Sequence, residues 1–189
     1  MIIIGITGTL GAGKGTVVDY LVQKYHFVHF SVRDFLKEEV AKRNLPQNRD
    51  SFTQVANDLR RLYSPSYIVD QLYERAAQQS QNAIIESIRT PGEIDSLKQK
   101  ADFILLAVDA QTELRYQRVV IRNSETDHID FETFKQNEQR EMNSSDPYKQ
   151  NLGECIRRAH FILNNDGNVE QLQQQVDKII KNNLQKTKN

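Results

Sequence analysis

Residues Gly8 to Thr16 hold four glycines and a lysine, and residues of these types could bind phosphate groups. Gly8 and Gly13 are separated by four residues, and Lys14 follows directly. Glycines at this spacing let successive backbone N–H groups turn towards an anion, while the lysine ammonium reaches the outer phosphates of a nucleotide. We therefore expect the phosphates of a nucleotide to contact Gly8, Leu10, Gly11, Ala12, Gly13, Lys14, Gly15 and Thr16.

The segments on either side can position this loop. The apolar run Ile2 to Ile6 predicts a buried strand that ends at the loop. Apolar residues at helical spacing follow between Val17 and Val22, which predicts a helix that begins near Gly13 and directs its N-terminus at the phosphates. Strand, glycine loop, lysine and helix in this order indicate the P-loop, or Walker A, motif rather than an ordinary glycine-rich turn.

The composition sets limits on the class of protein. With 189 residues, 38% of them apolar and 26% charged, the chain is expected to form one soluble domain over residues 1–189. Because 25 basic residues balance 25 acidic ones, we expect neither nucleic acid nor membrane as a partner. The single cysteine, Cys155, excludes an internal disulfide, and the first apolar run is too short for a signal peptide or a membrane span. A cytoplasmic location is the resulting expectation.

Apolar runs and helical patterns alternate along the rest of the chain, which predicts a parallel α/β sheet with right-handed crossovers. Residues 31–80 are expected to hold three helical segments, with Pro65 at the first position of one of them. Thr90 to Glu93 is typical of a capping box that opens another helix. Residues 123–150 are polar and have few candidate core residues. The further short, non-alternating runs that predict strands lie at 27–30, 83–85, 103–108 and 161–163.

With its loop spelled Gly11-x-Gly13-Lys14-Gly15-Thr16, the chain resembles the nucleoside monophosphate kinases of the adenylate kinase and dephospho-CoA kinase superfamily, nearly from end to end. The phrases Ser-x-x-Asp, Ile-x-x-Ile-Arg and Asn-Asp-Gly are most similar to a kinase-like domain that occurs alone or fused to a deoxycytidylate-deaminase-type domain. The resemblance implies a P-loop three-layer α/β/α sandwich with a five-stranded parallel sheet, a helical acceptor-binding segment at 31–80 and a lid at 123–150. One cysteine cannot supply the zinc ligands of a deaminase.

The segment that begins at Ser31 resembles the phrase that opens the acceptor site in this superfamily. Ser31 and Asp34 match the phrase, whereas Val32, Arg33 and Lys37 differ from the residues typical of adenylate kinases. The resemblance makes Asp34 a candidate catalytic residue, although Ser31 with Asp34 could equally be a pair that caps a helix.

Residues 84–89 resemble the phrase in which an aspartate helps to hold hydrated Mg²⁺ and an arginine clamps the acceptor phosphate. Glu86 stands at the aspartate position and Arg89 at the arginine position, where a guanidinium matches phosphate oxygens. Read alone, Arg89 would form a surface ion pair with Glu86 or Glu93. Thr16 is the second candidate metal ligand, and the sequence departs from the usual P-loop pattern in having Gly15, as adenylate kinases do, at the position of the Ser/Thr that ligates the metal. The histidines lack metal-ligand spacing and are expected to be structural: His26, His29, His128 and His160.

The residues after the fourth predicted strand resemble the helix that leads into a kinase lid. Arg115, Arg118 and Arg122 share one helical face, which by itself is typical of a solvated surface. The resemblance assigns Arg118 to the donor base and Arg122 to its phosphates, with Arg140 as an arginine contributed by the lid. It also places the turn Asn164-Asn165-Asp166-Gly167 near the donor adenine.

These residues together predict an ATP-dependent phosphotransferase that uses Mg²⁺ and a small nucleotide acceptor. Arg60, Arg61 and Arg89 favour a (deoxy)nucleoside monophosphate, whose phosphate needs arginines and no base. Dephospho-CoA is an alternative acceptor, because its ribose hydroxyl would use a carboxylate base such as Asp34. A module that senses or hydrolyses a nucleoside triphosphate without an acceptor is the third reading, since a fold does not determine an activity.

Overall fold

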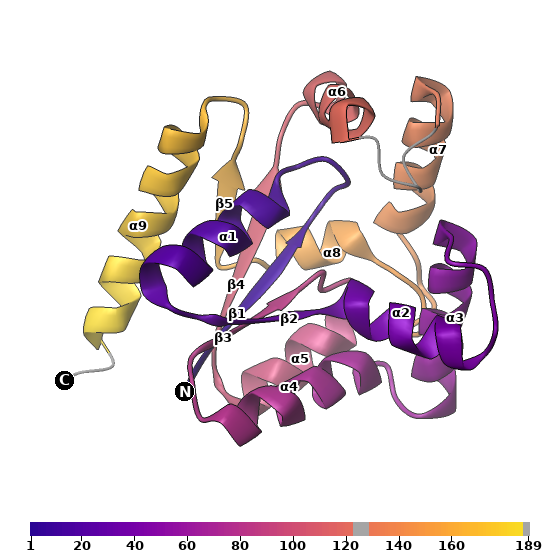
Figure 1. The fold of residues 1–189 in the computed structure, drawn as a ribbon, viewed down its shortest axis with the longest axis horizontal. Coiled ribbons are helices and arrows are strands. Elements are labelled where there is room, and N and C mark those ends of the chain that lie inside the picture. The colour runs from indigo at the N-terminus through magenta and orange to yellow at the C-terminus, as the bar shows by residue number, and fades with distance from the viewer. Residues whose placement is uncertain (123–128, 187–189) are drawn as a thin grey trace.

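The computed structural model describes residues 1–122 and 129–186, which form a five-stranded, fully parallel sheet in the order β2-β3-β1-β4-β5. Helices cover both faces, as Figure 1 shows, so the predicted three-layer α/β/α sandwich is confirmed. No helix in the described part of the chain is both long and apolar enough to cross a membrane. The strands are β1 (Ile2–Gly8), β2 (Val28–Ser31), β3 (Ala83–Glu86), β4 (Asp102–Asp109) and β5 (Phe161–Asn164).

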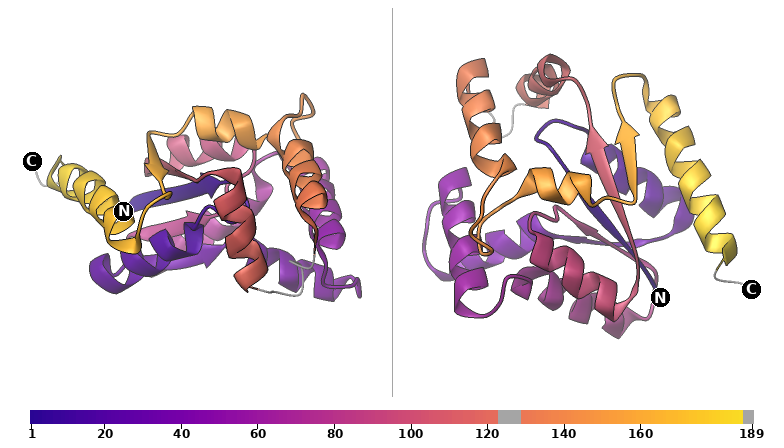
Figure 2. Two further views of the ribbon diagram at one scale, coloured as in Figure 1. Left: turned by 90° about the horizontal axis from the view of Figure 1, so that it is seen from above. Right: turned by 180° about the vertical axis from the view of Figure 1, so that it is seen from behind.

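Two apolar cores lie on opposite faces of the sheet. Side chains alternate between the faces along a strand, so Ile3 joins one core and Ile4 the other, and both are fully buried. Viewed from behind in Figure 2, α5 and α8 lie over one face. One core is completed by α1 (Lys14–Tyr25) and α9 (Val169–Lys186), and the other by α2 (Val32–Lys42), α3 (Arg49–Leu62), α4 (Tyr67–Gln79), α5 (Pro91–Lys100) and α8 (Leu152–Arg157).

The helices between β2 and β3 are α2, α3 and α4, the three that the sequence predicts for residues 31–80. The expectation for Pro65 is wrong: α4 begins at Tyr67 and Ser66 is its N-cap residue, so the proline precedes the cap. The capping box of α5 is confirmed, because the Thr90 hydroxyl accepts a hydrogen bond from the Glu93 backbone N–H and the Glu93 carboxylate accepts one from the Thr90 backbone N–H.

The carboxyl ends of all five strands meet at one edge of the sheet. The register places Ile6 beside Glu86, Ser31 beside Glu86 and Gly8 beside Val108. Figure 1 shows α6 (Thr112–Arg122) and α7 (Phe131–Met142) beyond this edge. Ligands of open parallel sheets bind there, because the loops that leave the strands surround the opening. Residues 123–128, which include part of the expected lid and His128, lie outside the described residues.

Candidate active site

The phosphate loop connects the end of β1 to the start of α1. Gly13 is the N-cap residue of α1 and has φ 98°, a left-handed conformation that favours glycine. A Cβ atom on Gly13 would also lie 2.1 Å from Asn165 Nδ2. Since Gly13 has no side chain to cap the helix, the first N–H groups of α1 remain available to an anion. The predicted strand, loop and helix are therefore present in the predicted order.

Lys14 lies at the start of α1 and folds back over the loop. Its Nζ donates hydrogen bonds to the carbonyl oxygens of Gly8 (2.9 Å) and Thr9 (2.8 Å). Burial, with a smaller effect from the charges of Arg89 and Arg122, lowers the pKa of Lys14 to about 7, although the carboxylates of Glu86 and Glu141 act in the opposite direction. The loop thus presents an ammonium that an added anion would stabilise.

The lowered pKa of Lys14 predicts that nucleotide binding weakens at alkaline pH. Bound phosphate favours the charged ammonium and raises the pKa of Lys14 above its value of about 7. Below about pH 7 the ammonium is already charged; above it, binding must take up a proton, and the affinity for ATP falls by up to about tenfold per pH unit. Calorimetric titrations at about pH 8 in two buffers of different ionisation enthalpy should measure uptake of about one proton. Lys14→Met should abolish this uptake, and uptake that persists in the variant would contradict the assignment.

A cavity of about 200 Å³ opens directly beside Lys14. It lies between the phosphate loop, the end of β3 and helices α2, α3 and α7. The apolar residues that line the cavity are Leu10, Val32, Leu36, Phe52 and Ala56. Seven charged residues line the cavity together with Lys14: Arg33, Arg49, Arg60, Glu86, Arg89, Arg122 and Glu141.

Arg89 follows β3 and directs its side chain into this cavity. Its Nη1 donates to Glu141 Oε2 at 2.6 Å and to Gln150 Oε1 at 2.8 Å. A surface ion pair of this side chain with Glu86 or Glu93, the alternative that the sequence allowed, does not occur among the described contacts. Arg89 therefore places an ion-paired guanidinium in the wall of the cavity that Lys14 also lines.

Arg60 is held in the same cavity wall by a fully buried carboxylate. Its Nε and Nη2 donate to Glu93 Oε1 at 3.1 and 2.8 Å, and the side chain is 1% exposed. The other Glu93 oxygen accepts the backbone N–H groups of Arg89 (2.7 Å) and Thr90 (3.1 Å). Glu93 thus positions the Arg60 guanidinium and the Arg89 backbone, because a buried carboxylate without water contacts is stable only while these N–H groups donate to it.

Glu86 ends β3 and lines the cavity close to Lys14. Burial alone would raise the pKa of Glu86, but the hydrogen bond from His29 and the charges of Lys14, His29 and Arg89 leave it below its usual value. His29 Nε2 lies 3.2 Å from Glu86 Oε2, a contact that the sequence did not predict. Within the described chain no three His, Cys, Asp or Glu side chains cluster as metal ligands. One ionised carboxylate beside a phosphate loop suits Mg²⁺, which keeps several waters and takes ligands from substrate phosphates.

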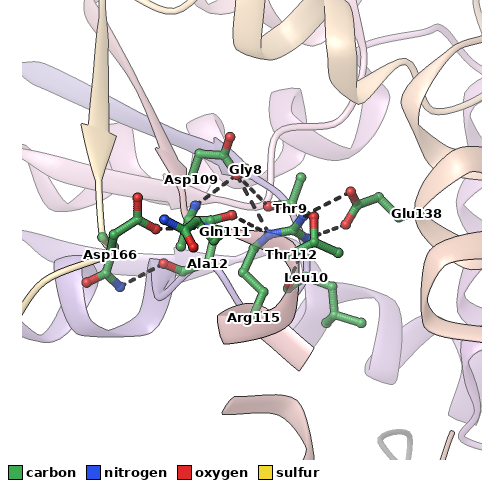
Figure 3. Close-up of polar contacts among 12 residues, drawn as sticks. Gly8, Thr9, Leu10, Ala12, Asp109, Gln111, Thr112, Arg115, Glu138 and Asp166 are labelled. Carbon is green, nitrogen blue, oxygen red and sulfur yellow. Dashed lines mark hydrogen bonds and ion pairs between the residues drawn. The ribbon is translucent and has the colours of Figure 1, made fainter. Parts of the chain in front are cut away.

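The three arginines of α6 separate in space. Arg115, at 3% exposed, points inwards and donates to the carbonyl oxygens of Ala110 (2.7 Å) and Leu10 (3.3 Å). It also forms an ion pair with Glu138 of α7, drawn in Figure 3. Arg115 therefore ties the phosphate loop to α7, and the solvated surface expected from the pattern alone is wrong for this residue.

Arg118 and Arg122 take two further positions. Arg118 Nη2 donates to the Asn165 carbonyl oxygen at 2.7 Å, whereas Arg122 lines the cavity. Asn165 also donates from Nδ2 to the Ala12 carbonyl oxygen at 2.8 Å. Figure 3 shows Asp166 beside Gln111, whose backbone N–H it accepts at 2.7 Å. The turn at 164–167 thus contacts both the phosphate loop and Arg118.

Three predicted residues lie away from the cavity. Asp34 pairs with Lys37 Nζ at 2.8 Å, its side chain is 64% exposed, and its backbone N–H is capped by Ser31. Arg140 donates to Asn137 and lies 3.8 Å from Asp50, with 57% of its side chain exposed. Neither Asp34 nor Arg140 lines the cavity, and Arg61 is also largely exposed. Catalytic roles for Asp34 and Arg140 stay predictions.

Sequence reasoning missed Arg49 and Glu141, which form an ion pair within the cavity wall. Glu138 and Glu141 are spaced so that they share one face of α7, and this spacing was the available signal. Arg49 directly follows the Asn48 cap of α3, an ordinary place for a surface residue. Nothing near either residue in the sequence indicated its partner.

A phosphate loop at the carboxyl edge of a five-stranded parallel sheet makes this a P-loop protein with a kinase-like fold. The chain belongs to the AAA domain family, which matches residues 7–135, and to the UPF0200 proteins. A UPF0200 protein of Methanococcus maripaludis is 31% identical over 171 residues, 89% of this chain and 90% of the relative. The UPF0200 protein of Methanothermobacter thermautotrophicus is 25% identical, over 96% of this chain and 90% of its own length.

Solved structures share the fold at lower sequence identity. The shikimate kinase of Bacteroides thetaiotaomicron superposes with a TM-score of 0.59 at 12% identity, covering 95% of this chain and 97% of that protein. The protein TT1252 of Thermus thermophilus superposes with a TM-score of 0.58 at 23% identity, covering 96% of this chain and 97% of that protein. At such identities the likeness establishes the arrangement of strands and helices.

Proposed function

We propose that this protein is an ATP-dependent phosphotransferase that transfers the γ-phosphate to a small nucleotide acceptor, most simply a (deoxy)nucleoside monophosphate. One observation carries the proposal: Lys14 of the phosphate loop and Arg89 of a second, arginine-rich site line the same cavity. A donor phosphate and an acceptor anion could therefore meet in a line, as phosphoryl transfer requires.

Phosphoryl transfer needs positioning and charge neutralisation rather than covalent chemistry by the protein. We assign the loop from Gly8 to Thr16 to the β- and γ-phosphates of ATP, with Lys14 on the transferring group. Arg118 and Arg122 bind the donor side, and Arg89 binds the acceptor. Glu86 and Thr16 would hold Mg²⁺, which when bound neutralises charge on the phosphate oxygens.

The same placement supports the domain assignment that we propose. Residues 31–80 contribute α2 and α3 to the cavity and are proposed as the acceptor-binding segment. A lid at 123–150 stays a prediction, of which the described part includes α7. The solved neighbour named as a shikimate kinase supports a kinase on this fold, without bearing on the acceptor.

The direct test is the rate of ADP formation from Mg·ATP with a panel of acceptors. The panel holds ribo- and deoxynucleoside monophosphates together with dephospho-CoA, and the Lys14→Met chain serves as the blank. Acceleration by one monophosphate supports the proposal and identifies the acceptor. ATP binding with a rate that no acceptor changes would contradict it and favour the sensor reading.

Replacing Asp34 by asparagine distinguishes a phosphate acceptor from a hydroxyl acceptor. Because Asp34 pairs with Lys37 outside the cavity wall, we expect Asp34→Asn to change kcat less than about threefold, far below the roughly 10²-fold minimum for a lost general base. The rate with the best acceptor of the panel measures the effect. A loss of about 10²-fold or more would instead support hydroxyl chemistry, with dephospho-CoA as the first acceptor to examine.

A further inference from the structure

A carboxylate of the protein itself lies between two arginines of the cavity. Glu141 of α7 is 7% exposed, and it accepts hydrogen bonds from Arg49 Nη2 through one oxygen and from Arg89 Nη1, at 2.6 Å, through the other. Burial alone would raise the pKa of Glu141, yet the charges of Arg89 and Arg49 leave it below its usual value. The two guanidinium groups therefore hold an ionised carboxylate.

The cavity wall contains more donors than this carboxylate uses. Arg49 Nε and Arg60 Nη1 are buried and have no hydrogen-bond partner within the described chain. A buried donor without a partner lowers the stability of the folded protein, so such groups commonly bind a ligand or a water. Glu93 already fixes the other two donor nitrogens of the Arg60 guanidinium, so Nη1 cannot turn away without breaking a buried ion pair.

The number of oxygens distinguishes the anions that could satisfy these donors. A carboxylate has two oxygens, and in Glu141 one accepts a hydrogen bond from Arg49 Nη2 and the other accepts one from Arg89 Nη1. A phosphate monoester offers three strongly accepting oxygens with a charge near −2. A tetrahedral dianion at this position could therefore accept from the same two nitrogens and still have an oxygen for Arg60 or for Arg49 Nε.

We propose that Arg49, Arg60 and Arg89 form the subsite for the phosphate of the acceptor, and that Glu141 occupies this subsite until the phosphate displaces it. The inference rests on the proposed function, in which the acceptor carries a phosphate. Glu141 is then an internal competitor, because its carboxylate is the anion beside these arginines before an acceptor binds. An acceptor displaces it only if its phosphate carries more negative charge and accepts more hydrogen bonds than the carboxylate does.

The test compares the affinity for inorganic phosphate of the unaltered chain and of Glu141→Gln by calorimetry. Removing the competing charge should tighten phosphate binding by about tenfold to hundredfold, the equivalent of one charge-assisted hydrogen-bond pair. Because the Glu141 charge also acts on Lys14, the comparison is repeated in the Lys14→Met background, where the tightening should persist if it arises at the three arginines. Glu132→Gln is the matched control, because Glu132 lies on the same helix with 70% of its side chain exposed and should leave the affinity unchanged.

Unchanged or weaker phosphate binding in Glu141→Gln would overturn the proposal, and so would acetate binding that equals phosphate binding. If Glu141→Gln does not fold, Glu141→Asp keeps the charge but shortens the reach to both arginines. It should tighten phosphate binding by at least about threefold, and no change would overturn the proposal. Because this readout needs no turnover, tighter phosphate binding without acceptor-dependent ADP formation would retain the subsite while rejecting the kinase activity.

Discussion

Replacing Lys14 by methionine is expected to lower kcat for phosphoryl transfer by at least about 10²–10³-fold, the usual effect of removing one preorganised charge or donor from a transition state. Lys14 begins α1 at the phosphate loop and its Nζ is held over the loop by two carbonyl oxygens. Methionine keeps the length and apolar character of the stem and removes only the ammonium, so the loss reports on charge. Steady-state ADP formation at saturating ATP and acceptor measures it.

The matched control for this experiment is Lys24→Met. Lys24 lies on the same helix at its far end, pairs with Asp177 at 2.7 Å and is 42% exposed. We expect this variant to keep the activity of the unaltered chain. A Lys14→Met chain that folds and retains more than about one tenth of the activity would contradict the assignment of Lys14 to the transferring phosphate.

Replacing Arg89 by lysine is expected to lower kcat/KM for the acceptor by about 10- to 100-fold, the loss of a charge-assisted hydrogen bond. Lysine keeps the positive charge that helps to lower the pKa of Lys14, so the donor site is disturbed little. It cannot reproduce the planar fork of a guanidinium on phosphate oxygens. The affinity for ATP, measured separately by calorimetry, should therefore remain within about threefold of the unaltered value.

Arg157→Lys controls for the chemical change itself, because Arg157 is 72% exposed and pairs only with Glu154 within the described contacts. An equal loss in Arg157→Lys would indicate a general effect on stability. If Arg89→Lys weakened ATP binding as strongly as it raised the acceptor KM, Arg89 would belong to the donor site instead.

Features that depend on neighbours in the sequence could be predicted from it. The glycines of the phosphate loop, Lys14 and the capping box at Thr90 all serve backbone groups a few residues away, so their spacing carries the information. The apolar runs likewise predicted a parallel sheet, because strands buried on both faces leave no polar alternation. Pro65 shows the limit of this reasoning, since the helix boundary differs by two residues.

Features that depend on distant partners could not be predicted. Arg115, Arg118 and Arg122 share one helical face and the same charge, yet Arg115 contacts Glu138, Arg118 contacts Asn165 and Arg122 lines the cavity. Arg49 and Glu141 are 92 residues apart and meet because the fold brings both α3 and α7 to the cavity. Asp34, which matches a sequence phrase, instead pairs with Lys37 one turn along its helix.

By itself, the sequence determined that this protein forms a phosphate loop between a buried strand and a helix in a parallel α/β fold, because backbone conformation and apolar periodicity depend on residues that are close in the sequence. Only the tertiary structure decided which arginines face the loop and which carboxylate already holds them. Such choices depend on charges brought together through space, and a buried charge is stable only beside the partner that the fold supplies.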